Sequence, residues 1–169
     1  MSPHSSAPPS GDGHEQVARL LRGVTRFVPH NRALGIGFVS LTAGRVTLAL
    51  PYDEKLVGNP LTGVVHGGAI TALLDAACGL AVFVKLGEAI PIATLDLRID
   101  YLRPATPSKE VRACAECFRV TRNVAFVRCE AFHAGPHDSG SAAAGLDVCA
   151  EHELVAVANG TFIVTRGRA

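Results

Sequence analysis

One acidic residue, Asp75, stands inside the most apolar stretch of the chain. Between Ala69 and Val84 the only other polar side chain is Thr71. A carboxylate among apolar side chains is costly unless it is paired or protonated, because it loses its hydration. Acids in such surroundings occur at active sites, and also as structural groups that bind a neighbouring strand or face water at a subunit boundary. The residue types leave both interpretations open.

The sequence His66-Gly67-Gly68 begins the same stretch. If a helix starts here, the N–H groups of its first turn have no partner within the helix and lie at the positive end of its dipole. Such groups suit an anion or a developing oxyanion. Two glycines let a substrate come close to this backbone, because no side chain stands in the way. By itself the motif is equally consistent with a glycine-rich loop and an incidental histidine.

Residues 66–86 are predicted to form that helix, since Ala and Leu are good helix formers and strand-like alternation is absent. Lys85 and Gly87 are typical of a helix end. Because the segment is apolar on every face, we expect the helix to be buried on all sides. Asp75 then lies in the middle of the helix, where it cannot act as an N-cap.

The other segments are expected to form one more helix and six strands. Residues 15–28 have apolar side chains at helical spacing and end near Pro29. The strand-like segments alternate and are joined by short turns, which favours an antiparallel sheet and an α+β fold. The predicted strands are 35–41, 45–50, 92–102, 109–120, 124–133 and 152–165, with an irregular loop at 51–65 and a long mobile loop at 134–151.

Small side chains dominate the predicted inner face of the later strands, which would let a curved sheet approach a helix closely. They are Ala113, Ala115, Cys117, Ala125, Cys129, Ala131, Ala156, Ala158 and Gly160. Cys114 and Cys117 form a CxxC, but residues three apart on a strand point to opposite faces. No second ligand pair accompanies them, so we predict neither a metal site nor a cofactor.

Composition narrows the classes of protein further. The chain has 169 residues and a net charge of +1, so it fits one domain and has no basic field for nucleic acid. We predict a disordered leader at 1–14 and a single domain at 15–169. An odd number of cysteines, no secretory signal and no sufficiently long apolar run indicate a cytoplasmic protein that does not bind membranes.

The chain resembles the hotdog-fold acyl-CoA thioesterases of the phenylacetic-acid-degradation type. Three features carry the resemblance: the HGG motif, the acid nine positions after its histidine (66 + 9 = 75), and the segment TLDLRIDYLRPA at 94–105. The resemblance covers residues 35–165. It implies a curved antiparallel sheet wrapped around the central helix, to which this chain adds an N-terminal helix. It also implies a homodimer, often paired into a homotetramer, with the acid of one subunit facing the helix N-terminus of the other.

On this resemblance Asp75 would act on an acyl-CoA thioester, as the nucleophile or as the general base that activates water. The Gly67 N–H would polarise the thioester carbonyl. His66 would help to shape that site, and Gly68 would contact the substrate. A non-catalytic acyl-CoA-binding protein with the same fold is the alternative. The sequence leaves open the acyl chain and whether the thiol is coenzyme A or a carrier-protein arm.

Further contacts are expected from four residues. Related enzymes often have Asn or Gln at the position of Pro60, so Asn59 would bind the thioester or water only after a one-residue shift of the loop. Thr94 matches a hydroxyl position of the family, although alternation puts it on the solvated face of its strand. Arg103 and Arg122 are candidates for binding the phosphates of coenzyme A.

Overall fold

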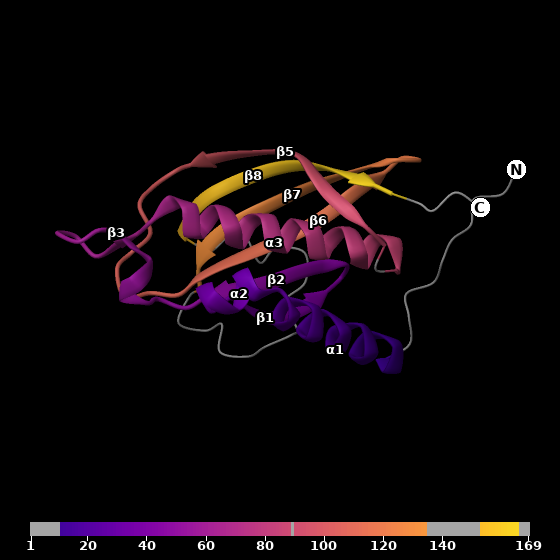
Figure 1. Ribbon diagram of the computed structural model, residues 1–169, viewed down its shortest axis with the longest axis horizontal. Coiled ribbons are helices and arrows are strands. Elements are labelled where there is room, and N and C mark those ends of the chain that lie inside the picture. The colour runs from indigo at the N-terminus through magenta and orange to yellow at the C-terminus, as the bar shows by residue number, and fades with distance from the viewer. Residues whose placement is uncertain (1–10, 89, 135–152, 166–169) are drawn as a thin grey trace, which may run out of the picture.

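The computed structural model describes residues 11–88, 90–134 and 153–165 of the chain. Most of the predicted leader and nearly all of the predicted loop 134–151 lie outside these ranges. The described segments form one curved sheet with a long helix against its inner side and two shorter helices beside them (Figure 1).

Six strands of the described chain form one antiparallel sheet in the order β1-β2-β6-β7-β8-β5. Their bounds are β1 Gly37–Thr42, β2 Arg45–Leu50, β5 Ile92–Tyr101, β6 Val111–Val120, β7 Val124–His133 and β8 Glu153–Val164. All six predicted strands are therefore confirmed, with small shifts at their ends. The turn between β1 and β2 contains Ala43 and Gly44, both with positive φ, as in tight antiparallel hairpins.

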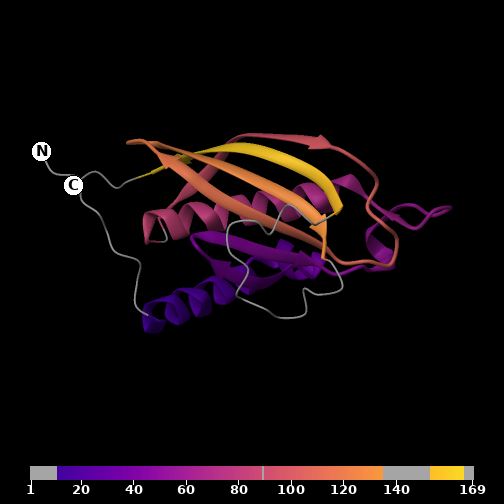
Figure 2. The ribbon, with the colours of Figure 1, turned by 180° about the vertical axis from the view of Figure 1, so that it is seen from behind.

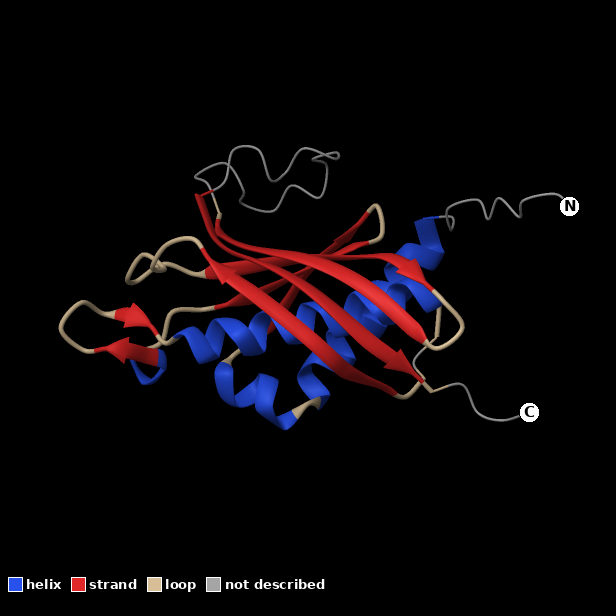
Figure 3. Ribbon diagram, turned by 90° about the horizontal axis from the view of Figure 1, so that it is seen from above, coloured by secondary structure: helices blue, strands red, loops and turns tan. Residues whose placement is uncertain are grey.

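The central helix, α3, runs from Gly67 to Leu86 along the concave side of the sheet, as Figures 2 and 3 show from behind and from above. It packs mainly against β6, with β2 and β7 beside it. The small residues predicted to face the helix are buried: Ala113, Ala115, Cys117, Ala125, Cys129, Ala131, Ala156, Ala158 and Gly160. Their size allows the close approach, because backbone and short side chains fill the space between the layers.

The prediction that this helix is buried on all sides is wrong for the described chain. A stripe along α3 is exposed or only half-buried, and its members recur at the three- and four-residue spacing of one helix face. These residues are Gly68, Thr71, Ala72, Asp75, Ala76, Gly79 and Phe83. By length and composition α3 could cross a membrane, but its other faces are packed in the core of the sheet layer.

Two helices precede the sheet. Helix α1, Gly11–Phe27, contains the predicted helix 15–28 almost entirely and packs against β1. A second helix, α2, spans Pro29–Leu34 and was not predicted. Pro29 both ends the first helix and occupies the first turn of the next, where its missing N–H costs nothing.

The segment 51–65, predicted to be irregular, contains short regular elements. A 3-10 turn at Glu54–Leu56 is followed by β3, Val57–Asn59, and β4, Val64–Val65, which pair as a separate hairpin. Strands of two or three residues are too short for alternation to reveal them. The hairpin projects beyond the end of the sheet (Figures 1 and 3).

Candidate active site

A groove beside the exposed stripe of α3 holds Asp75. The groove has a volume of about 670 Å³ and lies between α3, α2, the start of β5 and the end of β8. Its lining is mostly apolar and includes Ala76, Gly79, Leu80, Phe83, Ile92, Leu97 and Phe162. Asp75 is half-buried, and its Oδ1 accepts a hydrogen bond of 2.8 Å from Thr94 Oγ1. Among the described residues no group donates to Asp75 Oδ2, so that oxygen is available to water or a substrate.

Thr94 reaches Asp75 because β5 contains a β-bulge. Thr94 pairs with Phe162, whereas Asp96 pairs with the adjacent Thr161, so Leu95 is an extra residue in β5. A bulge reverses the alternation of the strand on its two sides. Thr94 consequently does not share a face with Asp96 and contacts Asp75 of the helix, although it is exposed in the chain as predicted.

The start of α3 is fixed by His66, which is the N-cap residue. His66 Nδ1 accepts a hydrogen bond of 2.9 Å from the Gly68 N–H, so the ring proton is assigned to Nε2. The His66 N–H donates to the Leu56 carbonyl at 2.8 Å. The turn also crowds against Gly58, where a Cβ would lie 2.8 Å from His66 Cα. His66 therefore shapes the helix start through its backbone and its ring.

The Gly67 carbonyl is held by two hydroxyl groups. Tyr101 Oη donates to it at 2.8 Å, and Thr71 Oγ1 at 3.1 Å. The Gly67 N–H has no hydrogen-bond partner among the described residues, so it can donate to a ligand. Sequence reasoning did not identify Tyr101, because its contact with Gly67 joins residues 34 positions apart.

Asp75 and the free Gly67 N–H do not meet within one chain. They are eight residues apart (75 − 67 = 8) on one helix, which separates their backbones by about 12 Å. Asn59 is not brought to Asp75 either and does not line its groove. Its Oδ1 accepts from the Leu61 N–H at 3.0 Å, which stabilises the turn of the β3–β4 hairpin.

The two candidate arginines lie at opposite ends of the sheet. Arg103, just after β5, lines a pocket of about 360 Å³ together with Gly67 and Tyr101. Its Nη1 is 2.8 Å from Glu153 Oε1, and this hydrogen bond holds the pKa of Glu153 below its ordinary value. Arg122 lies in the turn between β6 and β7, at the end of the sheet where β5 begins.

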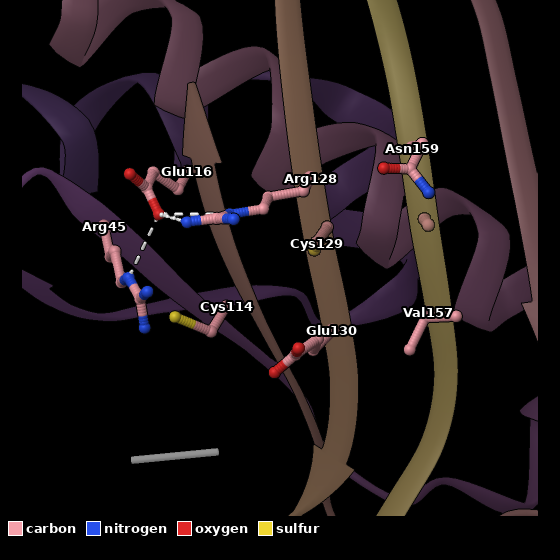
Figure 4. A pocket seen from close by; sticks show the side chains of 9 residues that line it. Arg45, Cys114, Glu116, Arg128, Cys129, Glu130, Val157 and Asn159 are labelled. Atoms are coloured by element: carbon pink, nitrogen blue, oxygen red, sulfur yellow. Dashed lines mark hydrogen bonds and ion pairs between the residues drawn. The ribbon is translucent and has the colours of Figure 1, made fainter. Parts of the chain in front are cut away.

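Another pocket lies on the outer face of the sheet (Figure 4). There Arg45 and Arg128 both contact Glu116 Oε2, at 3.4 and 2.9 Å. Hydrogen bonding to Arg128 is the main cause that lowers the pKa of Glu116. Cys114 lines this pocket, whereas Cys117 is buried on the helix side of β6, and burial raises the pKa of both thiols. The CxxC pair thus points to opposite faces, as alternation predicts, and cannot hold one ion together.

Known proteins share this sequence and fold. The family model described as "Thioesterase superfamily" matches residues 62–139. The Medium/long-chain acyl-CoA thioesterase YigI of Salmonella typhimurium is 31% identical in an alignment of 133 positions that covers 69% of this chain and 83% of that protein. A putative esterase of Halobacterium salinarum is 43% identical over 75 residues, 43% of this chain and only 50% of the relative's length.

A solved structure gives the same result for the fold. The phenylacetic acid degradation protein PaaI of Thermus thermophilus, solved in a mutant form, is 28% identical, with a TM-score of 0.63 over 82% of this chain and all of that chain (100%). The predicted hotdog fold is confirmed, and the relatives named as thioesterases support the prediction of a thioester hydrolase. The chain belongs to the thioesterase superfamily.

Proposed function

We propose that the protein hydrolyses acyl-CoA thioesters to the free acid and coenzyme A. The observation that carries this proposal is the carboxylate of Asp75, bound by Thr94 in an apolar groove with one oxygen free of protein donors among the described residues. An acid in such a groove is placed beside an apolar acyl group rather than beside a polar substrate. The name of the YigI relative, a medium/long-chain acyl-CoA thioesterase, supports the same substrate class.

A complete site requires two copies of the chain. The Gly67 N–H is a free backbone donor of the type that could bind the oxyanion, but it lies about 12 Å from Asp75 along the same helix. β5 is an edge of the sheet, and an edge strand can pair with the same strand of another copy. Leu95, Tyr101 and Leu102 on or next to this edge are exposed apolar groups. We therefore propose a homodimer in which Asp75 of one subunit faces the Gly67 N–H of the other.

Two routes for the chemistry are compatible with this arrangement. As a general base, Asp75 would take a proton from water while the water oxygen attacks the thioester carbonyl. The Gly67 N–H would stabilise the resulting oxyanion, whose collapse breaks the C–S bond and releases the thiolate of coenzyme A. As a nucleophile, Asp75 would instead expel the thiolate and form a mixed anhydride, which water then hydrolyses.

The other residues predicted to contact the substrate differ in whether they line the groove of Asp75 or the pocket of Gly67. Arg103 shares a pocket with Gly67, so it is placed to meet the phosphates of a substrate whose carbonyl binds there. Arg122 and Asn59 line neither the groove of Asp75 nor the pocket of Gly67. Gly68 lines the groove of its own chain and would contact the acyl side of the substrate.

The cellular setting and the finer family are also proposals. The four cysteines within the described ranges are free thiols, which suits the reducing cytoplasm. The similarity to PaaI of Thermus thermophilus supports the phenylacetic-acid-degradation type. We also propose a homotetramer, as the resemblance of the HGG…Asp75 motif to the hotdog thioesterases implies.

The decisive experiment is thiol release from butyryl-, octanoyl-, palmitoyl- and phenylacetyl-CoA by the wild-type protein and by Asp75→Asn. The substitution keeps the size of the side chain and its hydrogen bond to Thr94, but it removes the base and the nucleophile. We expect kcat to fall at least a hundredfold, with an unchanged melting temperature. Full activity of the variant would exclude this mechanism.

The alternative, a non-catalytic acyl-CoA-binding protein, predicts a different result in the same experiment. It would be stabilised against heat by acyl-CoA without releasing any thiol. Thermal stabilisation without turnover across the whole panel would therefore replace the hydrolase by a binding protein.

A further inference from the structure

The first peptide groups of α3 differ in how they are held. The Gly67–Gly68 peptide group is bound at both ends: its N–H donates to His66 Nδ1, and its carbonyl accepts from Tyr101 and Thr71. The preceding His66–Gly67 group carries the Gly67 N–H, which has no partner among the described residues. The carbonyl of the His66–Gly67 group accepts from the Ala69 N–H at 2.9 Å, a bond within the first turn. The direction of the free N–H therefore depends on that bond and on how firmly the following peptide group is held.

Among the described residues that hold this peptide group, Tyr101 alone comes from a distant part of the chain. His66 and Thr71 belong to the same turn of helix and move with it. Tyr101 is the last residue of β5, and its hydroxyl also lies 3.0 Å from Thr71 Oγ1. It thus ties the helix start to the sheet edge, in addition to the bond from the His66 N–H to the Leu56 carbonyl, which ties it to the 3-10 turn.

The fit between Tyr101 and Gly67 is close. A Cβ on residue 67 would lie 3.3 Å from the Tyr101 hydroxyl oxygen, tighter than most such contacts. The ring itself is 48% exposed in the chain, so it does little for the core. The hydroxyl is the part of the side chain that makes specific contacts.

We propose that Tyr101 is a positioning residue: its hydroxyl fixes the peptide group at Gly67–Gly68 and so aims the Gly67 N–H at the thioester carbonyl. This inference rests on the proposed function, in which that N–H binds the developing oxyanion. Tyr101 does not touch the reacting atoms. It acts instead on the direction of the Gly67 N–H. A shift of this N–H by a fraction of an ångström weakens its bond to the oxyanion of the transition state more than it weakens binding of the substrate.

Tyr101→Phe tests the proposal, with Tyr52→Phe as the matched control. These are the chain's two tyrosines, and Tyr52 Oη also donates to a glycine carbonyl, that of Gly63 at 3.2 Å. We expect Tyr101→Phe to lower kcat at least tenfold with KM within twofold, while Tyr52→Phe keeps both. Light scattering should show the same assembly for both variants and the wild type. A normal kcat in Tyr101→Phe, or a loss of activity that accompanies dissociation, would overturn the proposal.

A second measurement separates this inference from the proposed function. Amide hydrogen exchange at Gly68, followed by NMR, reports on the held peptide group without any substrate. We expect Tyr101→Phe, and not Tyr52→Phe, to speed this exchange several-fold. Unchanged exchange would overturn the role of Tyr101 even in an active enzyme. If exchange is faster in Tyr101→Phe but the wild-type protein hydrolyses no thioester, Tyr101 still holds the peptide group. The proposed function is then refuted, and so is the proposal that the Gly67 N–H binds a thioester carbonyl.

Discussion

Asp75 and Gly67 supply the two groups that the proposed hydrolysis needs, and each depends on a neighbour for its geometry. Thr94 Oγ1 holds one oxygen of Asp75, which fixes the rotamer of the carboxylate and leaves the other oxygen for water or substrate. His66 and Tyr101 hold the peptide group that follows the Gly67 N–H. At this scale the site consists of one acid and one backbone donor, each oriented by hydroxyl or imidazole groups.

The role of the Gly67 N–H can be tested by Gly67→Pro, which removes that donor. Proline is favoured at the first position of a helix, where its missing N–H breaks no helical hydrogen bond. His66 already has the extended conformation that a following proline requires, with φ −62° and ψ 132°. We expect kcat to fall roughly a hundredfold or more, as on loss of one oxyanion donor.

The control for this variant is its folding. Circular dichroism should match that of the wild type, since proline suits the backbone of this position. Because the proline Cβ would lie 3.3 Å from the Tyr101 hydroxyl oxygen, the Tyr101→Phe protein is measured beside it. A loss of kcat beyond that of Tyr101→Phe then reports the missing N–H. A Gly67→Pro protein that folds and turns over normally would show that another group polarises the carbonyl.

At the scale of elements, the groove exists because α3 is not fully covered. The sheet wraps its inner faces, while a stripe from Gly68 to Phe83 remains open towards α2, β5 and β8. Beyond Asp75 this stripe continues through Gly79. There is room for a Cβ at this position, since it would lie 3.8 Å from Ile92 Cδ1 and 3.9 Å from Phe162 Cε1, which are ordinary van der Waals distances. Gly79 thus leaves the groove open towards the C-terminal half of the helix.

Substitutions at Gly79 should change the preference for acyl chain length. Gly79→Ala fits the available space and should raise the free energy of unfolding by about 0.5–1 kcal/mol, because alanine is the better helix former. Gly79→Leu should fill the groove beyond Asp75. We expect it to lower kcat/KM for palmitoyl-CoA about tenfold or more relative to butyryl-CoA, a loss of ~1.4 kcal/mol in binding the longer chain.

The Gly79→Ala protein is the control for the larger side chain, since it shares the loss of glycine without blocking the groove. An equal loss for both substrates in Gly79→Leu would mean that the acyl chain leaves Asp75 in another direction.

At the scale of the whole molecule, the distance between Gly67 and Asp75 along α3 is the reason for proposing a dimer. No flexing of one chain brings the Gly67 N–H to Asp75, because both are part of one continuous helix. The exposed edge of β5 and the open stripe of α3 lie on the same side of the fold, where the groove joins them. A second copy with two-fold symmetry placed there would complete two sites at once.

Subunit complementation tests this arrangement. Asp75→Asn and Gly67→Pro proteins, each inactive alone, should recover activity when they form mixed dimers, because one of the two sites then has both intact groups. Random exchange of equal amounts should restore about a quarter of the wild-type activity, since half the dimers are mixed and each has one working site.

The double variant Asp75→Asn/Gly67→Pro, mixed with either single variant, provides the control, because no combination of these chains makes an intact site. If the two single variants form mixed dimers and yet stay inactive, both groups act within one subunit or in different reactions.

Local pattern was sufficient for much of this protein. Alternation and turn residues located the six strands, composition located α3, and the small residues facing α3 follow from the period of two in each strand. The spacing of His66-Gly67-Gly68 and Asp75, with the segment at 94–105, resembles the hotdog thioesterases, and that resemblance implied the family and the proposed chemistry. These features depend on residues close together in the chain, which is why a sequence reveals them.

Tertiary structure alone decided how the site is assembled. The place of Thr94 depends on a bulge at Leu95, and a bulge is defined by the pairing of β5 with β8 rather than by the residues of β5. The bond between Tyr101 and Gly67 joins residues 34 positions apart, and the open stripe of α3 depends on which faces the sheet covers. The sequence by itself thus determined the candidate groups of the proposed site and the elements on which they lie, whereas their orientation came from long-range contacts that no local period encodes.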